Sequence, residues 1–448
     1  MNDSPATPDP KSFATRIAAP AQHAVASGDI PGVVCLVWRR GELLQMDSVG
    51  LRDIEARRPV ERNTIFRIAS MSKPLTSAAA MILMERGVWR LEDPITRWAP
   101  EFAAMRVLRR AEGPLQDTYP APRAITIEDL MTHRSGLAYG FTARGPLAEA
   151  LKERFGLEFD SARSPDDWMK MLASLPLSYA PGERFNYSYA TDLLGVIIGR
   201  ATGLGTRAAM QQLLFDPLGM VDTDFWIPPE KHHRAAVLYR SSAPGNFVRI
   251  DLPGFMEQVP PSFSAGGQGL VSTADDYLAF ARMLLQGGES NGIRVLSEES
   301  TRLMAANRLT PAQRRNLQFG IPFFMGQGFG LGLSVIDDAK RNAWMGTGRH
   351  GAFGWPGLFG GWWQADPAEQ TVMLWLQQTM PQTIPGSGTK GDSRMAETLL
   401  RWVFSSPRLL ALLNTAAQRS GKAPRMPGTV ATQNFQKEAY AALRSNAS

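Results

Sequence analysis

Cysteine and histidine, on which many catalytic and metal sites depend, are scarce in this sequence: its 448 residues include one Cys and five His. The single cysteine, Cys35, excludes an intramolecular disulfide framework and any cysteine-rich zinc or iron–sulfur site. Five histidines leave little room for histidine-based triads and metal centres. The scarcity of both residues therefore argues against disulfide-stabilised folds, cysteine-rich metal sites and histidine-dependent catalysis.

Long apolar runs are also absent. The longest candidate, residues 78–84, is far shorter than the roughly 18 apolar residues of a membrane span. Residues 1–10 are polar and carry three Pro, without the basic start and apolar stretch of a secretory signal. We therefore expect a cytoplasmic protein that does not bind membranes.

The charges are nearly balanced, with 48 Lys and Arg against 42 Asp and Glu, a net charge of +6. The basic residues are scattered, which indicates a solvated surface rather than a nucleic-acid-binding face. Apolar residues at 44% and charged residues at 20% are typical of a globular protein. The length is sufficient for two to three domains.

Strand patterns lie towards the two ends of the chain, and helical patterns fill the middle. The predicted strands are 33–38 and 42–49, which form a hairpin, then 65–68, 330–336, 359–365 and 371–377. The predicted helices are 14–27, one that begins at residue 70 and ends before Gly87, 127–133, 165–175, 191–200, 206–214, 275–286 and 394–404. This arrangement predicts a mainly helical domain inserted into an α/β domain.

The same pattern suggests domain boundaries. Residues 1–12 are expected to form a disordered leader, and 13–75 with 255–404 a split α/β domain. Residues 76–254 are the expected helical domain, and 405–448 a C-terminal extension whose role the pattern leaves open.

A serine and a lysine three residues apart, Ser70 and Lys73, give the strongest chemical signal. At the first turn of a helix the two side chains share one face, and the helix dipole stabilises negative charge developing on the serine oxygen. A lysine removed from water can lose its proton near neutral pH and serve as the base for that hydroxyl. Alone, such a pair more often marks a capping serine and an exposed lysine.

The surrounding sequence resembles the class C β-lactamase-like branch of the serine β-lactamase and penicillin-binding-protein superfamily. The resemblance runs from about residue 15 to about 405 in the family's order. It rests on residues 66–75, 91–94, 127–137, 181–203, 266–276 and 354–367. It implies a β-lactamase/transpeptidase-like α+β fold, an α/β sandwich in which helices flank an antiparallel sheet and a mainly helical domain is inserted. The active site would lie between the two domains.

The family pattern implies roles for four positions. Ser70 would be the acylated nucleophile, while Lys73 and Tyr187 would relay its proton. Which of the two is the base stays open, because two interacting groups titrate as a pair. The backbone amides of Ser70 and Leu358 would form the oxyanion hole.

Two departures from the family motifs bear on the substrate. Tyr189 stands where an Asn usually binds the amide of a lactam side chain, and Trp355-Pro356-Gly357 replaces the usual Lys-Thr-Gly. An aromatic ring and a proline cannot pair with a carboxylate, so an anionic substrate loses its anchor and a neutral ester does not. Family VIII carboxylesterases often carry a similar Trp-Gly-Gly there. We therefore expect Tyr189, Trp355 and Gly357 to contact substrate.

The resulting prediction is a serine carboxylesterase that forms an acyl-enzyme on neutral esters of short to medium chain length. The alternative is an amide hydrolase of the same fold: a β-lactamase, a D-amino-acid peptidase or an oligomer amidase. An acyltransferase or a catalytically silent binding protein is a further reading. The only expected partner is a small-molecule ester, no metal or organic cofactor is implied, and the oligomeric state stays open.

A rival nucleophile occurs at Ser290, within a Gly-x-Ser-x-Gly pattern that resembles the nucleophile elbow of α/β-hydrolases, with His350 downstream. A true elbow follows a buried strand, whereas Ser290 follows a predicted helix amid turn residues. We therefore expect a surface turn there.

The other histidines and the cysteine are expected to be structural. His133 lies in a motif segment and should fix a loop near the site. His232 and His233 lack carboxylate or cysteine partners at metal-ligand spacing, and Cys35 lies in an apolar strand.

Overall fold

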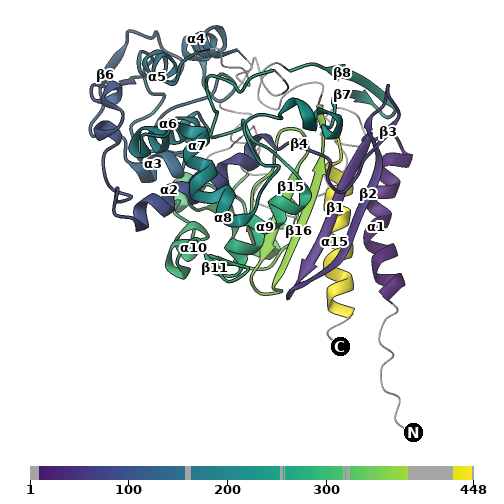
Figure 1. The fold of residues 1–448 in the computed structure, drawn as a ribbon. Coiled ribbons are helices and arrows are strands. Elements are labelled where there is room, and N and C mark those ends of the chain that lie inside the picture. The colour runs from purple at the N-terminus through teal and green to yellow at the C-terminus, as the bar shows by residue number, and fades with distance from the viewer. Residues whose placement is uncertain are drawn as a thin grey trace.

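An eight-stranded antiparallel sheet forms one half of the molecule, as the sequence predicted (Figure 1). The computed structural model describes residues 10–156, 163–252, 258–315, 323–343, 345–381 and 427–445, with residues 256 and 318. In spatial order the strands are β12 (Gln327–Phe329), β13 (Ser334–Ile336), β14 (Phe353–Gly354), β15 (Trp362–Asp366), β16 (Thr371–Gln377), β1 (Gly32–Arg39), β2 (Glu42–Asp53) and β3 (Arg58–Pro59).

Two adjacent interior strands of the sheet, β16 and β1, are buried on both faces. In β1, Val34 and Leu36 belong to the main core, whereas Val33, Cys35 and Val37 belong to a second core on the opposite face. Side chains alternate between the two faces of a strand, so a continuous apolar run requires cover on both sides. Helices provide that cover.

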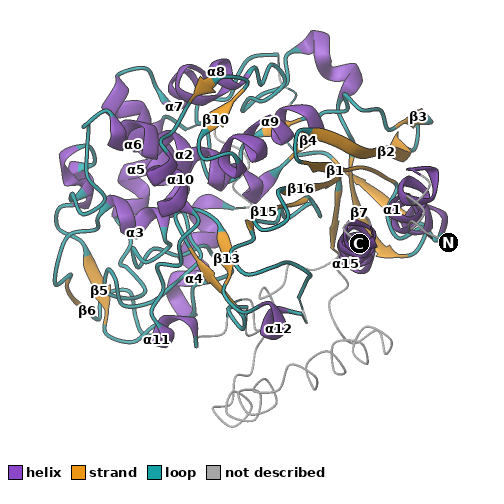
Figure 2. Cartoon of the chain, turned by 90° about the horizontal axis from the view of Figure 1, so that it is seen from below, coloured by secondary structure: helices purple, strands orange, loops and turns teal. Residues whose placement is uncertain are grey.

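The outer face is covered by the first and last helices of the chain, α1 (Pro10–Ala26) and α15 (Thr429–Ser445), which lie side by side (Figures 1 and 2). Phe435, Ala439 and Leu443 recur at helical spacing and are buried against this face. Residues 429–445, which the sequence analysis assigned to a C-terminal extension, therefore belong to the second core of the sheet.

Replacing Phe435 with alanine is expected to destabilise the protein by about 3–5 kcal/mol, because the ring is buried against Trp375 and its removal leaves a cavity. Urea unfolding followed by circular dichroism measures the change in unfolding free energy. Val430→Ala is the control on the same helix: that side chain is 48% exposed, and the change should stay within about 0.5 kcal/mol. Equal effects of the two variants would contradict the docking of α15.

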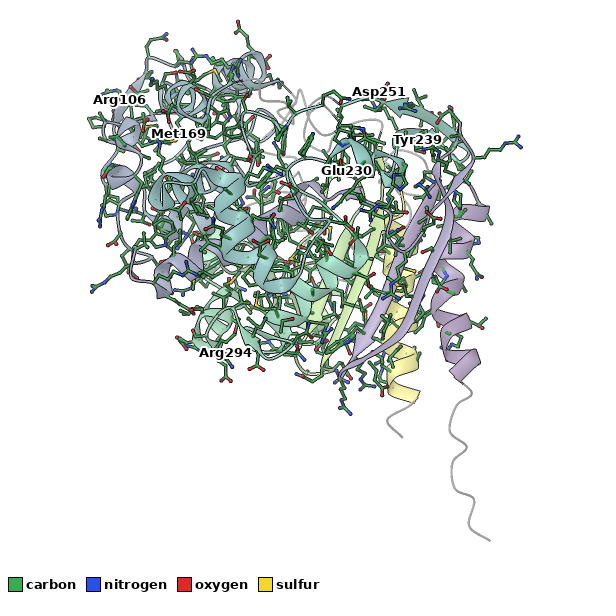
Figure 3. All side chains as sticks on the ribbon, in the orientation of Figure 1. Arg106, Met169, Glu230, Tyr239, Asp251 and Arg294 are labelled. Carbon is green, nitrogen blue, oxygen red and sulfur yellow. The ribbon has the colours of Figure 1, made fainter. Side chains whose placement is uncertain are left out.

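The inner face of the sheet packs on α9 (Ala274–Leu285). The Thr273 hydroxyl caps its N-terminus by accepting a hydrogen bond from the Asp276 amide, so the helix begins one residue before the predicted start at 275. Beyond α9 lies the helical part of the molecule, where Met169 is found, whereas Tyr239 lies above the sheet (Figure 3). Its helices are α2 (Ser72–Glu85), α3 (Ile127–Met131), α4 (Gly145–Phe155), α5 (Pro165–Ala173), α6 (Ala190–Thr202), α7 (Thr206–Met210) and α8 (Asp216–Leu218).

Smaller strands and helices lie outside this sheet and these helices. The short strands are β4 (Phe66–Arg67) with β9 (Val271–Ser272), β5 (Arg106–Leu108) with β6 (Thr118–Pro120), β7 (Leu238–Ala243) with β8 (Asn246–Ile250) and β17 (Thr379–Pro381), and β10 (Glu289–Ser290) with β11 (Ile293–Arg294). The remaining short helices are α10 (Glu298–Met304), α11 (Pro311–Arg314) and α12 (Ala339–Asn342).

Two predicted strands begin later than the apolar pattern suggested. The strand expected at 330–336 is only Ser334–Ile336, because Gly330–Leu333 closes a turn in which Gly332 has φ +87°. The strand expected at 359–365 begins at Trp362, after a turn with Gly360 at φ +86°. A positive φ breaks the extended backbone of a strand.

Some predictions fall outside the described residues. These are the helix expected at 394–404 and residues 1–9 of the expected leader, whereas residues 10–12 already belong to α1. Within the part of the chain that the structure describes, every helix is too short or too polar to cross a membrane.

Candidate active site

Ser70 lies in a tight turn between strand β4 and helix α2. The 3₁₀ turn η1 (Ala69–Met71) contains it, and Ala69 has φ +45°, a left-handed conformation that costs a non-glycine residue about 1–2 kcal/mol. The turn is held by the Ile68 amide, which donates to the Leu270 carbonyl, and by the Ser72 hydroxyl, which donates to the Ala69 carbonyl. Ser70 itself is only half-buried, so its hydroxyl stays open to a reactant.

Ser70, Lys73 and Tyr187 meet, although Tyr187 is 117 residues from Ser70 in the chain. The Tyr187 hydroxyl donates to Ser70 Oγ at 2.7 Å, and Lys73 Nζ donates to the same oxygen at 3.4 Å. The Lys73 ammonium also lies 4.4 Å from the centre of the Tyr187 ring. A hydroxyl with two such neighbours can pass its proton to either.

Lys73 is fully buried and is held by groups on two further segments. Its Nζ donates to the Gly267 carbonyl at 2.8 Å and to the Tyr139 hydroxyl at 3.4 Å. The Tyr139 hydroxyl in turn donates to Asp192 on α6 at 3.0 Å. The sequence analysis missed Tyr139 and Asp192. The one available signal was a lone acid in the otherwise apolar first turns of α6.

His133 packs against Tyr187, in line with the structural role expected for it. Its ring packs 4.7 Å from the Tyr187 ring, and its Nδ1 lies 3.3 Å from Ser188 Oγ. Burial, reinforced by the nearby Lys73 charge, lowers the pKa of His133 well below its usual value. His133 is therefore neutral and packs as an aromatic ring.

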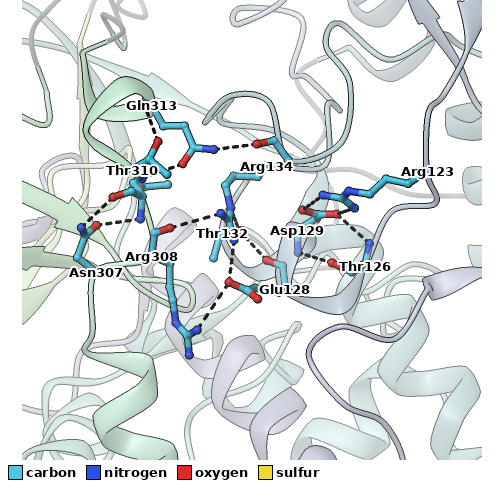
Figure 4. Close-up of polar contacts among 12 residues, drawn as sticks. Arg123, Thr126, Glu128, Asp129, Thr132, Arg134, Asn307, Arg308, Thr310 and Gln313 are labelled. Carbon is cyan, nitrogen blue, oxygen red and sulfur yellow. Dashed lines mark hydrogen bonds and ion pairs between the residues drawn. The ribbon is translucent and has the colours of Figure 1, made fainter.

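A polar brace fixes the segment that leads from α3 to His133 and Tyr139 (Figure 4). Arg134 donates to Glu128 at 2.7 Å and to the Arg308 carbonyl at 3.4 Å. Gln313 of α11 donates to the Gly182 carbonyl at 2.8 Å, on the chain that approaches Tyr187. These hydrogen bonds connect the segment after α3 and the segment before Tyr187 to the residues between β11 and β12.

Trp355 follows β14 and lies directly against Tyr187. Its indole N–H donates to the Tyr187 hydroxyl at 3.3 Å, and its ring packs on Phe323 and Phe329. The structure therefore brings Trp355 to the reacting groups, where it supplies a neutral donor and an aromatic wall.

Gly357 and Leu358 lie in the turn that follows Trp355, pressed onto the nucleophile's own turn. A Cβ atom at position 357 would come 2.5 Å from the Ile68 carbonyl oxygen, so only glycine allows this approach. Leu358 packs against the small core around Ala69. The turn after Trp355 therefore lies beside the turn that contains Ser70.

Tyr189 does not join the other predicted site residues. It is 1% exposed and packs edge-on against Tyr139, with Phe155 and Trp168 behind it. The chain turns into α6 at this residue, which directs the ring into the helical core. The structure therefore places Tyr189 behind the site.

The rival serine lies elsewhere. Ser290 ends β10, and the next two residues, Asn291 and Gly292, make a hairpin turn with positive φ. His350 bonds instead to the Asp337 carbonyl. The region is a hairpin and lacks the strand-to-helix geometry of a nucleophile elbow.

Cys35 is buried in β1, as expected. Burial, with a contribution from Asp47, raises the pKa of its thiol to about 12. Among the residues that the structure describes, no three His, Cys, Asp or Glu side chains cluster as metal ligands would.

Comparison with known proteins identifies the family to which the sequence is similar. The sequence profile of the family described as Beta-lactamase matches residues 17–391. Esterase EstB of Burkholderia gladioli is 33% identical over 401 residues, which cover 84% of this chain and 93% of EstB. An uncharacterized protein of Mycobacterium tuberculosis is 49% identical over 356 residues, covering 79% of this chain and 87% of that protein.

A solved structure agrees with these sequence relatives. EstCE1, described as a hydrolase with promiscuous acyltransferase activity, superimposes with a TM-score of 0.69 at 26% identity. The match covers 84% of this chain and 96% of EstCE1. The expected fold class is thereby confirmed by a second, independent comparison.

Proposed function

This chain belongs to the Beta-lactamase family, and we propose that it is a serine carboxylesterase that hydrolyses neutral esters of short to medium chain length through an acyl-enzyme. The observation that carries the proposal is the half-buried Ser70 hydroxyl with Tyr187 at 2.7 Å and Lys73 at 3.4 Å. The similarity to Esterase EstB favours an ester over an amide as the substrate.

Acylation would begin at Ser70. Its Oγ attacks the ester carbonyl carbon, while its proton passes to the Lys73–Tyr187 pair. The carbonyl oxygen becomes an oxyanion, which the backbone amides of Ser70 and Leu358 would stabilise by about 3–4 kcal/mol. The C–O bond to the alcohol then breaks, and the pair returns the proton to the departing alcohol oxygen.

Deacylation would repeat these steps with water. The water loses a proton to the Lys73–Tyr187 pair and attacks the acyl carbon, and the proton then returns to Ser70 as the carboxylic acid leaves. His133 has no role in this scheme, because its ring packs on the Tyr187 ring and its Nδ1 lies against Ser188 Oγ.

The preference for neutral esters rests on Trp355. Its side chain is 3% exposed and its one polar atom already donates to Tyr187, so it offers no cation to a substrate carboxylate. The neighbouring Pro356 is exposed and has no amide hydrogen to donate. An anionic substrate would gain no ion pair from either residue.

The expected result for the wild-type enzyme is rapid turnover of neutral nitrophenyl esters, slow turnover of esters that carry a carboxylate, and little or no hydrolysis of a chromogenic cephalosporin. Trp355→Lys should raise the ratio of kcat/KM for anionic over neutral esters by about tenfold, since one ion pair to a carboxylate contributes roughly 1.5 kcal/mol or more. Steady-state kinetics on matched ester pairs measures this ratio.

Trp355→Met is the matched control, because it removes the indole without adding a charge. If both variants change the ratio equally, the carboxylate argument fails. If the wild type hydrolyses the cephalosporin faster than every neutral ester, the esterase proposal gives way to a β-lactamase.

A further inference from the structure

Asp192 is a buried acid directly behind the reacting groups. It lies in the first turn of α6 and is 1% exposed. Both of its oxygens accept hydrogen bonds: Oδ1 from the Gly267 amide at 2.9 Å, and Oδ2 from the Tyr139 hydroxyl at 3.0 Å. Two donors on two oxygens suit an ionised carboxylate.

A charge at this depth needs an opposite charge nearby. Burial raises the pKa of the Asp192 carboxyl, and the positive charge of Lys73 acts against that rise. One hydroxyl separates the two groups, since Lys73 Nζ donates to Tyr139, which donates to Asp192. The backbone closes the ring, because Gly267 accepts from Lys73 through its carbonyl and donates to Asp192 through its amide.

We propose that Asp192 is a positioning residue of this site. Its carboxylate, acting through the Tyr139 hydroxyl, stabilises the positive charge of the Lys73 ammonium and fixes the orientation of that group. It thereby sets the pH range in which Ser70 is acylated. This inference rests on the proposed function for its substrate, although the proton network itself does not depend on the kind of acyl donor. Both residues act through Lys73: the Tyr139 hydroxyl accepts from Lys73, and Asp192 accepts from Tyr139.

The direction in which the pH profile should shift follows from the negative charge of Asp192. A negative charge beside the Lys73–Tyr187 pair stabilises the protonated form of the pair, whichever member is the base. Removing that charge lets the pair lose its proton more easily. The basic, active form then persists to lower pH, and the acidic limb of the pH profile moves in the same direction.

Other titratable groups around the pair leave this sign unchanged. From the segment after α3 come Tyr139 and the neutral His133, and from the segment before α6 come Tyr187 and Tyr189. On α7, Arg207 is paired with Asp224. The turn around Gly267 contributes its backbone amide and carbonyl.

Asp192→Asn tests the proposal, because it keeps the shape of the side chain and removes the charge. We expect the acidic limb of kcat/KM to move down by about one pH unit, and kcat at the optimum to fall about tenfold. KM should change less than twofold. Tyr139→Phe breaks the relay with the carboxylate intact, and should likewise lower kcat with KM preserved.

Asp276→Asn is the matched control. Asp276 is a buried acid on α9 that also accepts from a backbone amide and a hydroxyl, those of Asp222 and Thr223. Its loss should affect stability and leave the pH profile in place. Superimposable pH profiles for the wild type and Asp192→Asn would overturn the proposal. If Asp192→Asn does not fold, unchanged kcat in Tyr139→Phe would overturn it.

A second measurement tests the role of Asp192 independently of the ester substrate. A fluorophosphonate probe labels Ser70 when Oγ attacks phosphorus, fluoride leaves and the serine proton passes to the Lys73–Tyr187 pair. The pH dependence of labelling should shift in Asp192→Asn as kcat/KM does. If Ser70 is labelled with this shift but no ester is hydrolysed, the esterase proposal fails and the role of Asp192 stands. If Ser70 is never labelled, both fail.

Discussion

Replacing Ser70 with alanine is expected to lower kcat for nitrophenyl esters by at least about 10⁴-fold, the largest effect of any single substitution in this protein. The variant keeps the turn, because that turn is held by Ile68 and Ser72 and not by the Ser70 hydroxyl. It removes the atom that both Lys73 and Tyr187 contact. With no nucleophile to acylate, the bound ester has only water to react with.

Two measurements check this expectation. Steady-state hydrolysis gives the loss in kcat, and intact-protein mass spectrometry after a short incubation detects the acyl group on the wild type and its absence on Ser70→Ala. Ser290→Ala is the matched control, because it removes a hydroxyl in the β10–β11 hairpin. Activity retained in Ser70→Ala and lost in Ser290→Ala would reject the site described above.

Tyr187→Phe is expected to lower kcat by about 10²–10³-fold, within the range of a lost proton-transfer group. The ring remains on His133 and beside Trp355, so the pocket keeps its shape. What disappears is the hydroxyl that donates to Ser70 and accepts from Trp355. Because Lys73 still lies 3.4 Å from Ser70, some activity should remain.

The contribution of the hydroxyl is measured by comparing kcat and KM across pH for Tyr187→Phe and Tyr440→Phe. Tyr440 on α15 is an equally buried tyrosine whose hydroxyl bonds to Asp366 on the outer face of the sheet. Its replacement should change stability and leave kcat unchanged. Full activity in Tyr187→Phe would leave Lys73 as the only base.

Much of this organisation could be predicted from local pattern. The hairpin of β1 and β2, the strand 371–377 and the start of α9 follow from alternation and capping, which depend on neighbouring residues. Ser70 and Lys73 could be paired because residues three positions apart in a helical turn lie on the same face. Tyr187 could be added only through the family resemblance, since its distance along the chain carries no geometric information.

Other features depend on packing and could not be predicted in this way. The late start of β13 was hidden because Gly330 and Gly332 occur within an apolar run, and only the positive φ of Gly332 shows the turn. Helix α15 is polar on average, so its sequence alone does not show that it packs on a core. The role of its apolar stripe is clear only when the sheet face that it covers is known. Tyr189 occupies a motif position, but the entry into α6 turns it into the core.

The scarcity of cysteine and histidine excluded several chemistries, and the spacing of Ser70 and Lys73 indicated a serine nucleophile with a lysine partner. Those conclusions belong to the sequence, because composition and helical periodicity are local properties. The placement of Trp355 on Tyr187, and of Asp192 behind Lys73 through Tyr139, was decided by the tertiary structure alone. Each of these contacts joins segments far apart in the chain, and whether a buried charge finds a partner depends on which segments the fold brings together.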